Sequence, residues 1–174
     1  MLELLRKRRS IRKFTNQPVE SDKIDLLIEA AVRTPTSRGR NPWHFIVVTE
    51  PELLRQLGKA KEHGSAFLAA APLAIVVAAD TTISDVWTED CSIAAMVIQL
   101  TALDLGLGSC WVQIRLRPHQ GECSAESYLK ELLNLQDSHV VECIIALGYP
   151  AEEKNGHALE SLPFDRVHTN KFAG

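Results

Sequence analysis

The sequence predicts an α+β chain in which one β-sheet is covered by helices on both faces. Stretches with helical periodicity alternate with short runs of apolar, β-branched residues. These runs are continuously apolar, which is typical of strands that are buried on both faces of their sheet. No internal repeat, low-complexity tract or linker interrupts the pattern. We therefore expect residues 1–174 to form a single domain, long enough to bury about 70% of its extended-chain surface.

The first half of the chain predicts two helices, two strands and one polar loop. The segment SDKIDLLIEAAVR begins a helix at Ser21, because its apolar residues recur at the spacing of one helical face. TPTSRGRNP at 34–42 is a loop by composition, bounded by prolines. The runs HFIVVT (44–49) and PLAIVVAA (72–79) are the strands, and Pro51 suits the first turn of a helix between them.

The second half predicts a long helix at 86–105, a strand at 109–115, a helix at 125–135 and a strand at 139–148. The long helix ends at Gly106 and contains SIAAMVIQLTAL, which is apolar almost all round. Such a helix is buried on every side, either within its own chain or against a second subunit. No periodicity follows Tyr149.

Composition and charge exclude several classes of protein. The chain has 22 Asp and Glu against 19 Lys and Arg, whereas a general nucleic-acid binder is usually basic. Its longest apolar run, at 66–79, is too short to span a bilayer and contains Pro72. The four cysteines are scattered without a CxxC pair, which is typical of reduced thiols. We expect a soluble, cytoplasmic protein that binds neither nucleic acid nor membrane.

Common cofactor and catalytic motifs are absent. The sequence has no GxxxxGK[ST] loop, and LGLGSCW (105–111) lacks the third glycine of a dinucleotide fingerprint. The six histidines show neither HExxH nor zinc spacing with a cysteine, so no metal site is expected. Cys110 has no recognisable partner histidine, which favours a small buried thiol over a nucleophile.

Two polar segments remain as candidate binding sites. LRKRRSIRKF (5–14) places six cations in eight positions, interleaved with apolar residues that a disordered tail rarely carries. We expect this basic segment to be docked and to bind a compact anion such as phosphate, although a solvated helix end would have the same composition. The loop PTSRGRNPW offers hydroxyl, guanidinium and amide donors between prolines, which suits a binding site. The alternative interpretation is that it only connects two elements and is hydrated.

These segments resemble the nitroreductase family of FMN-dependent oxidoreductases over nearly the whole chain. RRSIRKF (8–14) is similar to the family's N-terminal R-x-S segment, and AAVRTPTSRGRNPWHFIVV (30–48) to its A-P-S-S-x-N-x-Q-P-W loop and following strand. LGLGSCW resembles the Gly-rich turn into a central strand, and ALGYPAEEK (146–154) the late L-G-Y-P segment. The four motifs follow the family's order along the chain.

The resemblance implies a nitroreductase-like fold with a central mixed β-sheet, in a domain-swapped homodimer with two FMN sites at the subunit interface. The tail at about 149–174 would wrap the partner. Arg8, Arg9 and Ser10 of one subunit would contact the phosphate, ribityl chain and pyrimidine edge of FMN, and Gly108 and Ser109 would lie against its ring system. Arg12 would also bind the cofactor, and Lys154 and Arg166 would be weak phosphate contacts. The other subunit would contribute Pro35, Thr36, Ser37, Arg38, Gly39 and Asn41.

The resemblance also implies a reaction. NAD(P)H would give hydride to the flavin N5 atom, and a small electrophilic acceptor, such as a nitroaromatic or a quinone, would then take it up in ping-pong turnover. Arg9 is the expected electrostatic stabiliser of the reduced flavin. Two alternatives remain: a flavoprotein of the same fold that fragments flavin or dehalogenates a phenol, and a binding module that uses the basic segment without catalysis.

Overall fold

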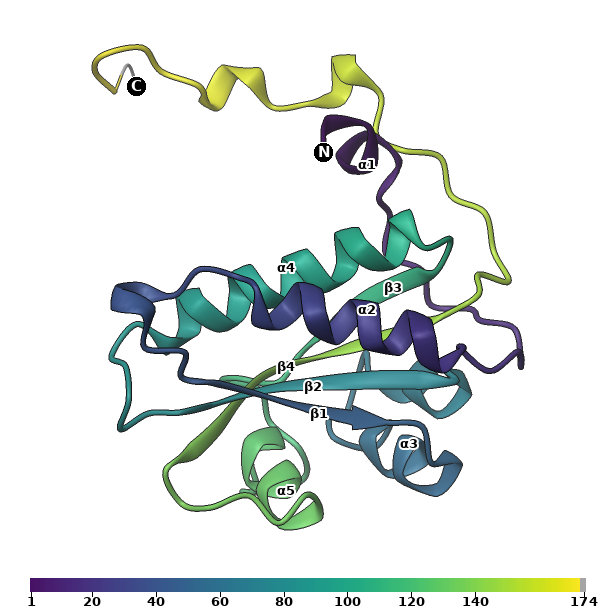
Figure 1. The fold of residues 1–174 in the computed structure, drawn as a ribbon, viewed down its shortest axis with the longest axis vertical. Coiled ribbons are helices and arrows are strands. Elements are labelled where there is room, and N and C mark those ends of the chain that lie inside the picture. Colours follow the sequence, from purple (N-terminus) through teal and green to yellow (C-terminus); the bar gives the residue numbers. More distant parts are fainter. Residues whose placement is uncertain (173–174) are drawn as a thin grey trace.

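The computed structural model describes residues 1–172 and contains one four-stranded sheet (Figure 1). Its strands lie in the order β1-β2-β4-β3, and every neighbouring pair is antiparallel. The strand bounds are β1 (Trp43–Val48), β2 (Leu73–Asp80), β3 (Gly108–Gln113) and β4 (His139–Gly148). The predicted α+β class is confirmed.

The sheet is antiparallel rather than mixed. Within residues 1–172, a parallel pairing occurs only as one isolated bridge, between Ser10 and Ser109 at the outer edge of β3. The continuously apolar strands reflect cover on both faces of the sheet, and this cover makes a strand apolar whichever way its neighbour runs. The sequence pattern therefore predicts the layers and not the strand directions.

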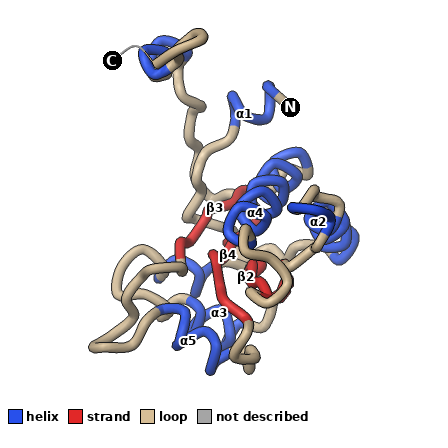
Figure 2. Tube along the Cα trace, turned by 90° about the vertical axis from the view of Figure 1, so that its left-hand side faces the viewer, coloured by secondary structure: helices blue, strands red, loops and turns tan. Residues whose placement is uncertain are grey.

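Helices cover both faces of the sheet, as Figure 2 shows from the side. One face carries α2 (Ser21–Val32) and α4 (Trp87–Asp104), and the other carries α3 (Pro51–Leu57) and α5 (Ala125–Leu132). Alternate residues of β2 enter the two cores, so Ile75 packs with α2 and α4 while Val76 packs with α3 and α5. These helices and strands match their predicted ranges within three residues.

Helix α4 is covered mainly by its own chain. It packs against α2 and against the sheet, and Ile98, near its middle, is fully buried in this core. Ile93 on the same helix is 42% exposed, and Met96 and Val97 one turn later are half-buried, so an apolar strip remains partly uncovered by residues 1–172. The apolar pattern of the helix is thus explained largely within one subunit. No helix in the described part of the chain is long and apolar enough to cross a bilayer.

The two ends of the chain project together from this body (Figures 1 and 2). Helix α1 (Leu2–Lys7), which the sequence did not predict, crosses the tail at Gly156, where a Cβ atom would overlap the Arg6 carbonyl oxygen. Every described residue from His157 onward is exposed. The tail carries exposed apolar side chains, namely Leu159, Leu162, Phe164, Val167 and Phe172. Wrapping of a partner by this tail stays a prediction.

Candidate functional site

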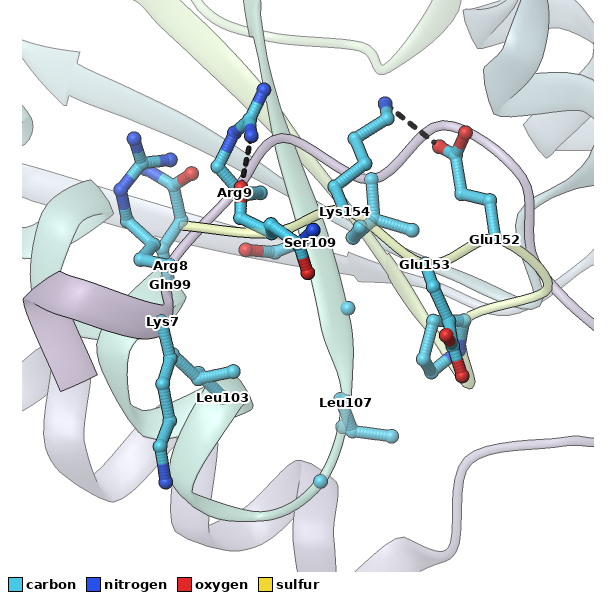
Figure 3. Close-up of a pocket in the computed structure, with 15 residues that line it drawn as sticks. Lys7, Arg8, Arg9, Gln99, Leu103, Leu107, Ser109, Glu152, Glu153 and Lys154 are labelled. Carbon is cyan, nitrogen blue, oxygen red and sulfur yellow. Dashed lines mark hydrogen bonds and ion pairs between the residues drawn. The ribbon is translucent and has the colours of Figure 1, made fainter. Parts of the chain in front are cut away.

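A cavity of about 340 Å³ lies where the C-terminal end of α4 turns into β3. The basic segment forms one wall, the α4–β3 turn forms the floor, and the beginning of the tail forms the opposite wall (Figure 3). The structure brings five of the predicted site residues together here, Arg8, Arg9, Gly108, Ser109 and Lys154. The cavity also has lining residues that were not predicted, including Lys7, Gln99, Glu152, Glu153 and Asn155.

The basic segment is docked, as its apolar residues predicted. Ile11 and Phe14 are buried in the core, and the Ile11 amide donates to the Ser109 carbonyl at 2.9 Å. The approach to β3 is close, because a Cβ atom on Gly108 would lie 2.9 Å from the Ile11 Cγ2 atom. On its other side, the segment receives a backbone hydrogen bond from Ala151 in the tail. The cations of the segment are thereby held on a fixed backbone.

Glu152 ties the tail wall to the basic segment. Its carboxylate accepts hydrogen bonds from the backbone amides of Arg12 (2.6 Å) and Lys13 (3.2 Å) and pairs with Lys154 at 3.1 Å. The amide of Arg12, followed by the side chain of Lys154, lowers the pKa of this carboxyl to about 2. Lys154 also donates to the Ser10 carbonyl oxygen at 2.8 Å. Lys154 is therefore fixed where it lines the cavity, and Ser10 lies next to the cavity without lining it.

Two cations of the cavity have no partner among residues 1–172. Arg9 donates to the Asn155 carbonyl, whereas the side chains of Lys7 and Arg8 make no hydrogen bond or ion pair with any described residue. Arg8 is half-buried, so its guanidinium has lost part of its hydration without gaining an acceptor. An anion in the cavity would supply that acceptor.

Two polar side chains on the floor of the cavity are also unpartnered. Ser109 and Gln99 are each only 5% exposed, and neither the hydroxyl nor the amide forms a hydrogen bond with a described residue. Ser109 was predicted from the sequence. Gln99 was missed, although it is the one amide within the apolar run SIAAMVIQLTAL, and a polar residue there was the available signal.

Arg12 does not line the cavity. Its Cζ atom lies 5.9 Å from the centre of the Phe67 ring, in a cation–π contact on the other side of the segment. Arg12 is thereby separated from Arg8 and Arg9, which line the cavity. Cys110 is 1% exposed, and burial raises the pKa of its thiol against the opposing effect of the Arg12 charge. This is the expected buried thiol.

The 34–42 loop lies at the opposite end of α4. The Ser37 amide donates to the Asp90 carboxylate at 2.9 Å, in the first turn of that helix, and Thr36 hydrogen-bonds Asn41 within the loop. Arg38 and Asn41 have positive φ angles and are exposed. Since 18 helical residues span about 27 Å, the predicted loop residues are not brought to the cavity within one chain, and this applies to Pro35, Thr36, Ser37, Arg38, Gly39 and Asn41.

Comparison with known proteins agrees with this architecture. The chain matches the model of the Nitroreductase family over residues 5–64 and 58–149. The solved structure of an FMN-dependent nitroreductase from Clostridium difficile is 46% identical, with a TM-score of 0.97 over 99% of this chain and 100% of that one. A protein of Archaeoglobus fulgidus, named as a candidate NADH dehydrogenase/NAD(P)H nitroreductase, is 35% identical over 98% of each chain.

A more distant relative has a similar description. An NADPH-dependent oxidoreductase of Staphylococcus aureus is 28% identical over 97% of this chain and 72% of its own length. The family match covers most of the described fold, including the basic segment, the 34–42 loop and the α4–β3 turn. The chain belongs to the nitroreductase family.

Proposed function

We propose that the chain is an NAD(P)H-dependent FMN oxidoreductase that reduces small electrophilic acceptors such as nitroaromatics or quinones. The observation that carries the proposal is the cavity between the basic segment and the α4–β3 turn, which Arg8 lines without an acceptor among residues 1–172. The naming of similar proteins as FMN-dependent nitroreductase and NADPH-dependent oxidoreductase supports it.

The residues of the cavity fit a phosphorylated flavin. Guanidinium and ammonium groups match a phosphate, with charge-assisted hydrogen bonds that are stronger than neutral ones. The unpartnered groups of Ser109 and Gln99 suit a hydroxylated chain, because each can donate and accept. Glu152 does not oppose an anion strongly, since its carboxylate is already held by Lys154 and two backbone amides.

The protein's own groups bind and orient in this proposal. Lys7 and Arg8 bind the phosphate, and Lys154 adds positive charge from the opposite wall. Bound FMN supplies the hydride-transfer chemistry of the reaction. Arg9, whose guanidinium is positioned by the Asn155 carbonyl, adds fixed positive charge that favours the anionic reduced cofactor. Cys110 takes no covalent part, because its thiol is buried and its pKa is raised.

A second subunit completes the proposed site. A cavity of about 340 Å³ is at the small end of the range for ligand pockets, so it suits the phosphate and chain better than the whole cofactor. The loop that the family resemblance assigns to the cofactor lies at the far end of α4. In a symmetric dimer, the loop of one chain can face the cavity of the other. The exposed apolar tail and the uncovered strip at Ile93 would then be buried between subunits.

Flavin binding by matched arginine variants tests the proposal. Arg8→Ala should weaken FMN binding about ten- to a hundredfold, since one charge-assisted contact contributes about 1.5–3 kcal/mol. Riboflavin lacks the phosphate and should bind wild type and variant alike. Arg6→Ala is the control, because Arg6 is exposed and paired with Glu3.

The same protein should then react with NAD(P)H. Bleaching of the visible flavin absorption on addition of NADH or NADPH, and its return with a quinone or nitroaromatic, is the expected result. A wild-type protein that is colourless and does not bind added FMN would contradict the proposed function. Equal loss of FMN and riboflavin in Arg8→Ala would show that Arg8 supports the fold rather than the phosphate.

A further inference from the structure

Gln99 is the one buried amide of helix α4, and its side chain has no partner within residues 1–172. The side chain is 5% exposed, and its remaining exposure is to the cavity that it lines. In Figure 3, Gln99 lies on the side of the cavity that carries Lys7 and Arg8, across from Glu152 and Glu153. Its amide therefore points toward the space where the proposed cofactor places its phosphate and polyol chain.

The other buried polar residue of α4 provides a contrast. Asp90 is 3% exposed, and its carboxylate accepts from the Ser37 amide at 2.9 Å and lies 3.4 Å from the Ser84 hydroxyl. Buried polar groups in proteins are almost always hydrogen-bonded in this way. Gln99 has no such partner among residues 1–172, at the position where α4 borders the cavity.

The amide of Gln99 is open to the cavity and has free hydrogen-bonding capacity. Among residues 1–172, the fully buried side-chain atoms without a hydrogen-bond partner belong to Trp43 and Glu142, so the amide atoms of Gln99 keep contact with the space that the residue lines. A leucine would suit the surrounding helix, whose buried residues nearby include Ile98, Leu100 and Ala102. A polar group with free donors and an acceptor, placed among apolar neighbours at the wall of a cavity, is typical of a binding residue.

We propose that Gln99 is a cofactor-positioning residue that hydrogen-bonds the phosphorylated polyol chain of the flavin. Its Nε2 group donates to a phosphate or ester oxygen, and its Oε1 atom accepts from a chain hydroxyl. Arg8 supplies charge, while Gln99 fixes the direction of the chain toward Ser109 on β3. The inference rests on the proposed function, and it assigns the residue that orients the chain in the cavity.

The first test is flavin affinity, followed by quenching of flavin fluorescence. Gln99→Leu keeps a similar volume and should weaken FMN and riboflavin alike, about three- to tenfold, because the chain hydroxyls are common to both. Gln99→Glu should restore riboflavin binding and weaken FMN further, because its carboxylate accepts from a hydroxyl but repels the phosphate. Thr101→Val, a polar-to-apolar change on the same helix outside the cavity, should leave both affinities unchanged.

The second test separates a binding role from a structural one. Gln99→Leu should not lower the Tm of the flavin-free protein, because the amide has no hydrogen bond within residues 1–172 to lose, and should reduce the Tm increase that FMN produces. A lower Tm of the flavin-free variant would show that Gln99 supports the fold or a subunit contact, and would overturn the inference. So would unchanged FMN affinity in Gln99→Leu. A wild-type protein that binds neither flavin would overturn the proposed function and this inference with it.

Discussion

The backbone amide of Ser37 donates a hydrogen bond of 2.9 Å to the buried carboxylate of Asp90. This contact joins the 34–42 loop to the first turn of α4, while the basic segment docks beside the last turn of the same helix. The helix thus holds two predicted halves of a site about 27 Å apart within one chain. A shared site between two chains follows from this separation if the two halves bind one cofactor.

Asp90→Ala should release the 34–42 loop from α4. The Ser37 amide and the Ser84 hydroxyl lose their acceptor, so we expect the free energy of unfolding to fall by about 1–3 kcal/mol. Trypsin should then cut faster after Arg38 and Arg40, which are exposed in the loop. Glu89→Ala, an exposed neighbour in the same turn, is the control. Unchanged cleavage in Asp90→Ala would mean that the loop is fixed by other contacts.

A charge on α4 should have different effects at two positions. Ile98 is fully buried in its own chain, so Ile98→Asp should unfold the subunit, because an unpaired buried carboxylate costs several kcal/mol. Ile93 is 42% exposed, so Ile93→Asp should keep the fold and separate the proposed dimer. Circular dichroism and sedimentation distinguish the two results. A folded Ile93→Asp dimer of unchanged stability would place the subunit interface elsewhere.

Acid should loosen the attachment of the basic segment to the tail. The pKa of Glu152 is about 2, below its ordinary value of 4.5, because the ionised carboxylate is hydrogen-bonded in the folded protein. Its contribution to stability is therefore complete above about pH 4.5 and is lost as the pH falls through about 2. The protection of the Arg12 and Lys13 amide protons, measured by NMR relative to the intrinsic exchange rate at each pH, should fall over this range.

Two variants check the cause of that pH dependence. Glu152→Gln should protect the Arg12 amide less than the wild type at neutral pH and should lose little further protection on acidification. Glu153→Gln, at the exposed neighbouring position, should behave like the wild type. Equal protection of Arg12 in Glu152→Gln and wild type would show that the carboxylate does not hold the segment.

The sequence predicts the layers of this fold well. The helix beginning at Ser21 has one apolar face, and the strand at 139–148 is an almost continuous apolar run. Both patterns reflect burial in the core, and both elements occur as predicted. Helix α1 was not predicted because its six residues bury no side chain, so no apolar periodicity marks it. The antiparallel pairing was not predicted, because the sequence of a strand that is buried on both faces does not reveal the direction of its neighbours.

The candidate site was predicted in part, for reasons that depend on the backbone. Arg8 and Ser109 meet at the cavity because Ser10 and Ile11 pair with β3, a contact between segments about 100 residues apart. Arg12 belongs to the same basic segment but faces Phe67, and composition does not reveal on which side of an extended segment a residue lies. One chain does not bring the 34–42 loop and Arg8 together, so their joint role in binding one cofactor stays a prediction that requires a second chain.

Complementation between two variants tests the shared FMN site most directly. Arg8→Glu disables the cavity of its own chain, and the double variant Ser37→Asp, Arg38→Glu disables the loop, so each homodimer alone should bind no FMN. Mixed in equal amounts and allowed to exchange subunits, the two should form heterodimers with one intact site and one doubly altered site. About a quarter of the wild-type number of sites should then bind FMN, as expected for random pairing in a two-fold dimer. If heterodimers form and still bind no FMN, the shared site is contradicted.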